Sequence, residues 1–382
     1  MKKRGKWIVG ILIFLIAIIS LCYYEVYISY NKITENNYSI ENKKISKDIN
    51  LVIISDLHDN ELGEKNKELI DKINSLSPDI ILVVGDVVNS DSANSHIVTN
   101  LMKDLCKNNK VFYSLGNTDK DYIESGTSDL VKELKDVGVT VLDNEYKDIK
   151  INGNNIRIGG MYAYAFGLNG NNDVDKDTME EGVYDFLTDF QNTDSYKIMM
   201  AHRPDSFIFG NASKIWDIDL VVSGHTHGGQ VRVPFKGGLY VGDQGWFPKY
   251  DKGLFDLNKI KILITSGLGS GKQKVPRFNN PPEVVNLKIS TQLSNWFQKW
   301  ILSNGRSRWR HEWNEFWLKN CFSVKNQIWL KWFYSNRKIL VIINVRKVGT
   351  ILKQEKVKLE LSLRVSDEKW QHHDNSYVWI WI

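Results

Sequence analysis

The sequence predicts an α/β sandwich of two mixed β-sheets flanked by helices, preceded by an N-terminal transmembrane helix. Three observations support this fold class. Strand-like and helix-like segments alternate in the first part of the chain, and strand-like segments dominate the later part. Short polar motifs follow the most apolar of these segments. An uncharged apolar run stands near the N-terminus and is long enough to cross a bilayer.

Short β-branched and apolar runs predict the strands. In order, the predicted strands are 51–54, 80–84, 111–113, 156–158, 197–200, 220–222, 231–233, 262–265 and 284–289. Apolar residues at helical spacing from Leu69 to Leu76, before Pro78, predict an amphipathic helix, and a second helix is predicted over His96–Cys106. In open α/β sheets ligands bind outside the carboxyl ends of the strands, so residues that follow strands are candidates for a shared site.

The apolar run from Trp7 to Tyr24 follows basic residues at positions 2, 3, 4 and 6. A basic flank predicts that the N-terminus stays in the cytoplasm and that the body is extracytoplasmic, in a single-pass membrane protein. A cleaved signal peptide is the competing interpretation, but no pair of small residues follows the run. Leu21 before Cys22 also fits a lipoprotein cleavage site poorly. We therefore expect residues 1–24 to be an uncleaved membrane anchor.

Composition divides the remaining chain into a polar stalk at 25–49 with one edge strand near Tyr38–Ile40, a body at 50–290 and a tail at 291–382. The net charge of +5 conceals two opposite parts. Residues 1–290 hold 34 Lys and Arg against 38 Asp and Glu, whereas the tail holds 16 against 7. Because the body is mildly acidic, we expect it not to bind nucleic acid.

The tail has an unusual composition, since ten of the 13 tryptophans lie in it among lysines and arginines. Trp296, Trp300, Trp309, Trp313 and Trp317 recur near helical spacing, which favours an amphipathic segment on a membrane surface. An accessory binding domain with a strand at 339–345 is a second interpretation. A frameshift or read-through product without an evolved fold is a third. A tail that drives membrane or nucleic-acid binding would lose that binding on deletion of 291–382.

Polar residues of metal-ligand type follow five of the predicted strands. The motifs are Asp56-Leu57-His58, Gly85-Asp86, Gly116-Asn117, His202, and Gly224-His225-Thr226-His227-Gly228-Gly229. Taken alone, the first four are most often turns or structural residues. The fifth is stronger, because glycines allow close approach of the backbone and imidazole is a common metal ligand. Four of the eight histidines fall in these motifs, so the combination indicates one binuclear metal centre.

This motif series resembles that of the calcineurin-like metallophosphoesterase superfamily. The stretches Ala201–Pro204, Ser223–Gln230, Tyr240–Tyr250 and Gly267–Gly269 are similar to its membrane-anchored or exported bacterial branch, which includes relatives of UDP-2,3-diacylglucosamine hydrolases. The resemblance covers about residues 45–290. It implies a sandwich of two mixed sheets with helices outside, and two divalent metals. The mixed donor set suits Mn²⁺, Fe or Zn²⁺.

The resemblance also implies roles for individual residues. One metal would be held by Asp56, His58, Asp86 and His227, and the other by Asp86, Asn117, His202 and His225. Asp86, Asn117 and His202 are then the residues expected to take part in catalysis, through a hydroxide activated by the metals that attacks phosphorus.

One position departs from the pattern of the superfamily. Many members carry histidine after Gly-Asn, where it assists the leaving group, but this chain has Thr118. Threonine is no general acid near neutral pH, although Asp119 is placed to orient His202 or a backbone amide. Arg203 and Arg232 are candidate phosphate contacts, because guanidinium matches phosphate geometry. Surface charge is the alternative role for both.

The sequence thus predicts a hydrolase of phosphomonoesters, phosphodiesters or pyrophosphates. Lipid-linked and nucleotide-sugar substrates fit a site tethered to a membrane. The alternative is a non-catalytic, metal-dependent binding protein at the membrane, which Thr118 alone favours.

Overall fold

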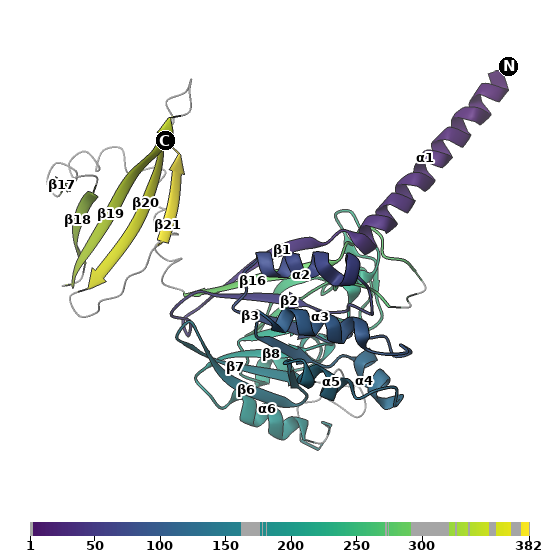
Figure 1. Ribbon diagram of the computed structural model, residues 1–382, viewed down its shortest axis with the longest axis horizontal. Coiled ribbons are helices and arrows are strands. Elements are labelled where there is room, and N and C mark those ends of the chain that lie inside the picture. Colours follow the sequence, from purple (N-terminus) through teal and green to yellow (C-terminus); the bar gives the residue numbers. More distant parts are fainter. Residues whose placement is uncertain are drawn as a thin grey trace. The chain divides into compact units, whose positions relative to one another are not determined.

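The computed structural model describes residues 3–161, 176–177, 179–180, 182–271, 273 and 275–291, together with five strands between 321 and 381. The chain divides into two units, Met1–Asn295 and Trp296–Ile382. The first unit holds a helix, two six-stranded sheets and the helices that cover them (Figure 1). The prediction of an α/β fold with two mixed sheets is confirmed.

The first sheet has the strand order β1–β16–β2–β3–β4–β5. Its strands are β1 (Thr34–Asn42), β16 (Glu283–Thr291), β2 (Ile49–Ile54), β3 (Ile80–Val84), β4 (Val111–Ser114) and β5 (Thr140–Leu142). β2 to β5 are parallel, whereas β16 runs antiparallel to β2 and parallel to β1. The carboxyl ends of β2, β3 and β4 therefore meet at one edge of the sheet, where the motifs of Asp56, Asp86 and Asn117 follow.

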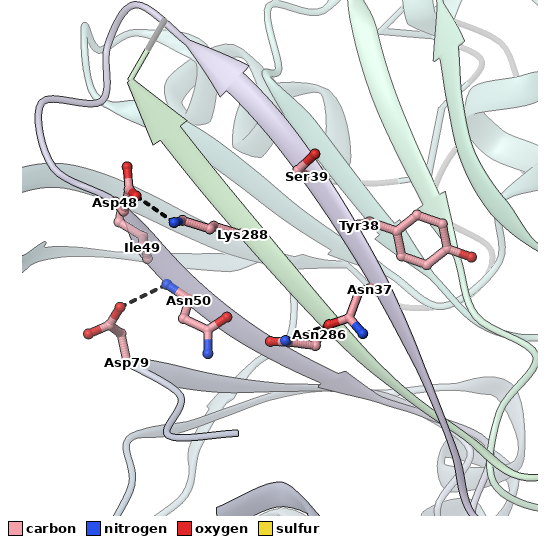
Figure 2. A pocket seen from close by; sticks show the side chains of 9 residues that line it. All are labelled: Asn37, Tyr38, Ser39, Asp48, Ile49, Asn50, Asp79, Asn286 and Lys288. Atoms are coloured by element: carbon pink, nitrogen blue, oxygen red, sulfur yellow. Dashed lines mark hydrogen bonds and ion pairs between the residues drawn. The ribbon is translucent and has the colours of Figure 1, made fainter. Parts of the chain in front are cut away.

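Residues 25–49 are more ordered than the expected stalk. They form the last turns of the N-terminal helix, the edge strand β1 and a turn that buries Ile45. The strand at Tyr38–Ile40 is confirmed, because Tyr38 pairs with Leu287 in β16. Figure 2 shows a shallow pocket at this edge of the sheet, whose polar groups pair with one another: Lys288 with Asp48 at 2.7 Å and the Asn286 amide with Asn37 at 2.8 Å.

The second sheet has the order β14–β15–β9–β8–β7–β6. Its strands are β14 (Gly253–Leu257), β15 (Ile260–Ile264), β9 (Leu220–Ser223), β8 (Tyr196–Ala201), β7 (Asn154–Met161) and β6 (Glu145–Ile151). The four central strands are parallel and the two outer ones are antiparallel to their neighbours. His202 and His225 follow β8 and β9, at the carboxyl ends of this sheet.

The predicted strand at 231–233 lies outside both sheets. It is part of a two-residue ladder between β10 (Arg232–Val233) and β11 (Gly237–Gly238), and a similar ladder joins β12 (Tyr240–Val241) and β13 (Gly245–Trp246). Pro234 lacks a backbone N–H and frequent glycines favour turns, so this segment makes short hairpins.

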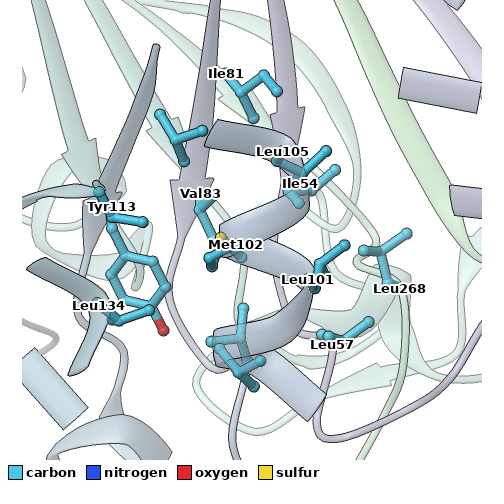
Figure 3. Close-up of a cluster of buried hydrophobic side chains, with 14 of the residues drawn as sticks. Ile54, Leu57, Ile81, Val83, Leu101, Met102, Leu105, Tyr113, Leu134 and Leu268 are labelled. Carbon is cyan, nitrogen blue, oxygen red and sulfur yellow. The ribbon is translucent and has the colours of Figure 1, made fainter. Parts of the chain in front are cut away.

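The two sheets pack face to face over one apolar core. Leu51, Leu82 and Val84 of the first sheet belong to the same buried cluster as Ile198 and Val222 of the second. A second cluster lies between the first sheet and helices α2 (Lys67–Ser75), α3 (His96–Cys106) and α5 (Leu130–Asp136), as Figure 3 shows for α3. A third packs α6 (Val183–Gln191) and α8 (Ala212–Ile215) on the second sheet. The predicted helix at His96–Cys106 is confirmed to the residue.

The N-terminal helix α1 spans Lys3–Asn31, and its segment Trp7–Asn31 is long and apolar enough to cross a membrane. Its large apolar side chains from Trp7 to Leu21, and Tyr23, Tyr24 and Tyr27, are exposed, in contrast to those of the core helices. Signal sequences pass the same test of length and composition. The end of α1 is attached to the body, where the Tyr30 hydroxyl lies 3.1 Å from Ser270 Oγ.

The second unit contains an antiparallel sheet of β17 (Cys321–Val324), β18 (Gln327–Tyr334), β19 (Arg337–Thr350), β20 (Val357–Asp367) and β21 (Ser376–Trp381). The predicted strand at 339–345 lies within β19. The five tryptophans at helical spacing, from Trp296 to Trp317, lie outside the described residues.

Candidate metal centre

The turns that follow the parallel strands bring two groups of metal-binding side chains together. Asp56, His58 and His227 form one group, and Asp86, His202 and His225 form the other. Within each group the potential ligand atoms lie within 4.8 Å of one another. The structure therefore brings together six of the seven residues that the motifs predict as ligands, in the two groups that the resemblance implies.

Asp86 lies between the two groups. Its Oδ2 is 3.8 Å from His58 Nε2 and 3.1 Å from His202 Nε2. Burial favours the neutral acid, but the neighbouring imidazoles of His202, His58 and His225 outweigh it and hold the pKa of Asp86 well below its usual value. A charged carboxylate in this position is suited to bridge two cations.

Asn117, the seventh predicted ligand, begins helix α4 (Asn117–Glu124) next to this carboxylate. A Cβ on the preceding Gly116 would lie 2.2 Å from Asp86 Oδ1, so glycine is needed for this close approach. The Asn117 Oδ1 atom is buried and has no hydrogen-bond partner, and the same holds for His58 Nε2. Buried polar atoms usually have partners, so two such atoms beside the Asp86 carboxylate fit a site for cations.

Backbone and amide oxygens orient the imidazoles from behind. His202 Nδ1 lies 2.7 Å from the Val84 carbonyl, His227 Nδ1 lies 3.3 Å from the Gly269 carbonyl, and His58 Nδ1 lies 3.2 Å from Asn89 Oδ1. Each contact leaves Nε2 directed toward the carboxylates, which is the usual arrangement around metal-binding histidines. Sequence reasoning missed these orienting contacts, because Asn89 stands in none of the motifs and Gly269 acts through its backbone.

The histidines differ in their electrostatic surroundings. Burial lowers the pKa of His227 to about 4, and this keeps its imidazole neutral and able to act as a ligand. For His202 burial is outweighed by Asp86 and Asp56, which raise its pKa to about 10. Cations compete with protons for such a nitrogen, so a cation held by His202 would displace a proton.

The hydrogen bonds of the Asp119 carboxylate do not include one to His202, whose orientation was one of the two roles expected for Asp119. It accepts hydrogen bonds from backbone amides, which was the other, including those of Asp86 at 2.9 Å and Gly116 at 2.9 Å. Thr118 donates its backbone N–H to Asp86 Oδ1 at 2.8 Å and its hydroxyl to the Val88 carbonyl at 2.7 Å. The threonine hydroxyl is thus used to hold the turn.

The two candidate phosphate contacts differ in position. Arg203 lies next to the second group, where its guanidinium contacts Asp243 at 2.7 Å and Asp205 at 3.4 Å. Asp243 in turn lies 3.4 Å from His225 Nε2. Arg232 binds Asp251 and the Gly228 carbonyl, both at 2.8 Å, which attaches the β10–β11 hairpin to the loop of His227. These contacts favour a structural role for Arg232.

We expect metal binding to stabilise the body, because without a cation buried ligand atoms of the site have no hydrogen-bond partner. A ligand at 100 times its Kd adds about 2.7 kcal/mol to the free energy of unfolding. Adding Mn²⁺, Zn²⁺ or Fe²⁺ to chelator-treated protein in detergent should raise its Tm and give two ions per chain by elemental analysis. The His96→Ala variant, altered at an exposed histidine outside the site, should behave identically. An unchanged Tm with all three metals contradicts the site.

Comparison with known proteins agrees with this geometry. Residues 49–229 match the family described as calcineurin-like phosphoesterase. The uncharacterized metallophosphoesterase Cj0846 of Campylobacter jejuni is 29% identical over 76% of this chain and 73% of its own length. Phosphodiesterase YaeI of Escherichia coli is 28% identical over 56% of this chain and 70% of its own.

Among solved structures, a 5'-nucleotidase precursor from Thermus thermophilus aligns with 72% of this chain and 61% of its own, at 12% identity and a TM-score of 0.36. The family match spans the strands and turns that carry all seven predicted ligands. The match over residues 49–229 and the two groups of metal-binding side chains support the calcineurin-like metallophosphoesterase superfamily, as the motifs predict, and the body is a metal-dependent phosphoesterase.

Proposed function

We propose that the body is a binuclear hydrolase of phosphomonoesters, phosphodiesters or pyrophosphates, in which Asp56, His58, Asp86 and His227 hold one cation and Asp86, Asn117, His202 and His225 the other. The position of Asp86 Oδ2 between His58 and His202 is the observation that carries this proposal. Two cations at such a site supply Lewis acidity and a nucleophilic hydroxide near neutral pH.

The side chains of the protein prepare this chemistry. Asp86 and Asp56 place negative charge between the imidazoles, and the backbone and amide oxygens behind the rings fix their orientation. Arg203 is held beside His225 by Asp243, where its guanidinium is available to a phosphoryl oxygen that displaces the aspartate. The protein therefore offers positive charge where a phosphoryl group would bind.

We further propose that α1 is an uncleaved anchor with the body outside the cytoplasm. The basic N-terminal flank supports this orientation, and the attachment of Tyr30 to Ser270 supports an intact helix. A lipid-linked or nucleotide-sugar substrate fits such a location. Mn²⁺, Fe and Zn²⁺ are the proposed metals because the donors combine imidazole, carboxylate and amide.

The test is turnover by the full-length protein in nanodiscs after metal removal and addition of Mn²⁺, Zn²⁺ or Fe²⁺. Substrates should include a nitrophenyl phosphomonoester, a bis-nitrophenyl phosphodiester, a nucleotide-sugar pyrophosphate and a lipid phosphoester. Metal-restored hydrolysis of one class supports the proposal and identifies the class. Two bound ions without turnover of any substrate would favour the alternative, a metal-dependent binding protein.

Thr118→His tests whether a missing acid limits the enzyme. Because general acids contribute about 100-fold or more, we expect kcat to rise up to about 100-fold for esters with poor leaving groups and little for nitrophenyl esters. Thr118→Val is the matched control, since it removes the contact with the Val88 carbonyl without adding an acid. Equal kcat values for the histidine variant and the wild type on every ester would mean that this position takes no part in catalysis.

A further inference from the structure

The hairpins next to the metal centre carry most of the large apolar side chains that the described part of the body exposes. Outside α1, seven large apolar side chains are exposed among the described residues. Four of them lie on the hairpin segment, residues 231–250, and a fifth, Val275, lies beside it; these five are Phe235, Tyr240, Trp246, Phe247 and Val275. Phe235 is fully exposed and Trp246 is 69% exposed. Such clustering marks an interaction surface.

Hydrogen bonds connect this segment to the end of α1. The backbone N–H of Arg232 donates to the Phe278 carbonyl at 3.0 Å, and the Gln230 amide donates to the Val275 carbonyl. A residue that precedes Phe278 and another that follows it bind α1. The Arg277 N–H donates to the Tyr30 hydroxyl at 3.2 Å, and the Asn280 N–H donates to Ser29 Oγ at 3.1 Å. The hairpins and the last turn of α1 are thus attached to the same loop.

The aromatic residues of α1 define where a bilayer would end. Trp7 and Tyr27 are both exposed and are separated by 20 residues, or about 30 Å of helix, which equals the thickness of the hydrocarbon core. Tyr23 and Tyr24 are also exposed near the second end. Trp and Tyr prefer the two interfaces of a bilayer. Ser29 and Tyr30, which hold the body, follow within one turn of Tyr27.

The charged residues of the segment agree with an anionic lipid surface. The exposed side chains between the aromatics include Lys236 and Lys249, and Lys236 Nζ lies 5.3 Å from the centre of the Phe247 ring. Asp243 of the same segment lies beside the metal centre, where it binds Arg203, whereas Arg232 binds Asp251 within the hairpin attachment. Exposed aromatics among lysines are typical of protein segments that lie in a bilayer interface.

From these contacts we infer that the hairpin segment 231–250 is a second membrane contact, which inserts Phe235, Trp246 and Phe247 into the same bilayer that α1 spans. The inference rests on the proposed anchor and not on catalysis. The segment that carries Trp246 also carries Asp243, which reaches His225 of the metal centre. The phosphate of an amphiphilic ester would then meet the site while its acyl chains stay in the bilayer.

The experiment measures the depth of a fluorophore in nanodiscs that contain anionic lipid and nitroxide-labelled lipid. Single-cysteine variants of the full-length protein, with Cys22, Cys106 and Cys321 replaced by alanine, carry an environment-sensitive label at Phe235→Cys, Leu15→Cys or Lys150→Cys. Leu15 reports on α1. Lys150 is an exposed control in β6. The β6–β7 hairpin contacts the turn after β1 through the hydrogen bond between Ser46 and Asn154. Because β1 is nine residues long, this turn lies about 30 Å from the end of α1.

We expect the labels at 235 and 15 to be quenched by the nitroxide lipid and the label at 150 to remain in water. The depth at 235 should be about 5–10 Å below the headgroups. Quenching at 15 with none at 235 would overturn the second contact. An aqueous label at 15 would overturn it as well, because no bilayer would then lie beside the hairpins. Neither result depends on turnover, so the proposed hydrolase stands or fails separately.

Discussion

Replacing Asp86 by alanine should abolish turnover and remove bound metal. Because its Oδ2 lies between His58 and His202, the variant loses a donor to both proposed cations at once. Mutation of residues behind metal ligands already costs about 10–100-fold, so we expect kcat/KM to fall by more than about 100-fold. The measurements are kcat/KM with each metal and the number of ions per chain.

Two further variants make this result specific. Asp86→Asn keeps the volume of the side chain and its place in the turn but removes the charge, so a loss of metal in both variants identifies the carboxylate as the cause. Asp136→Ala removes an exposed carboxylate that pairs with Lys132 and should leave activity and metal content unchanged. Near-normal turnover in Asp86→Ala would contradict the binuclear mechanism.

Much of the fold was predictable because its central strands are buried on both faces. A short continuous apolar run such as Ile80–Val84 is typical of a strand that is buried on both faces of a sheet. In the structure β3 has the same bounds, Ile80–Val84. The outer strand β6 was not predicted. Its sequence Glu145–Ile151 is mostly charged and exposed, so it carries little hydrophobic signal, and its pairing with β7 fixes it as a strand.

The candidate site was predictable to the extent that its residues follow strands. Asp56, Asp86 and His202 are found from their own segments, because parallel strands direct their carboxyl ends to one edge. The residues that orient these ligands could not be predicted from their own segments. Asn89 reaches His58 and Asp243 reaches Arg203 only through tertiary structure, and neither stands at a strand end or in a repeated pattern.

The role of Asp119 shows a similar limit. Its position after Gly-Asn indicated an orienting group, but the partners depend on how the turn after β3 approaches α4. The carboxylate accepts five hydrogen bonds: from the backbone amides of Asp86, Val87, Val88 and Gly116 and from the hydroxyl of Tyr113. It therefore holds the turn that carries Asp86, whose backbone adopts a left-handed conformation with φ 54°.

Asp119→Ala should consequently be the most destabilising single change in the body outside its apolar core. Burial raises the pKa of Asp119 to about 6, which shows the cost of placing a carboxylate there, and the five donors offset that cost. Without the carboxylate these buried donors have no acceptor. Since each unsatisfied buried donor costs about 1–3 kcal/mol and some regain water, we expect the free energy of unfolding to fall by about 3–5 kcal/mol.

The measurement is denaturant unfolding of the metal-free protein, followed by circular dichroism. Asp129→Ala is the matched control. Asp129 also accepts a backbone N–H, that of Lys132 in α5, but it makes this single bond at the exposed start of a helix. Loss of that cap should cost about 1 kcal/mol and leave metal binding intact. Asp119→Ala should also lose metal, since the turn of Asp86 loses its support. If Asp119→Ala unfolds like the Asp129 variant and still binds two ions, the turn is held by its neighbours and not by this carboxylate.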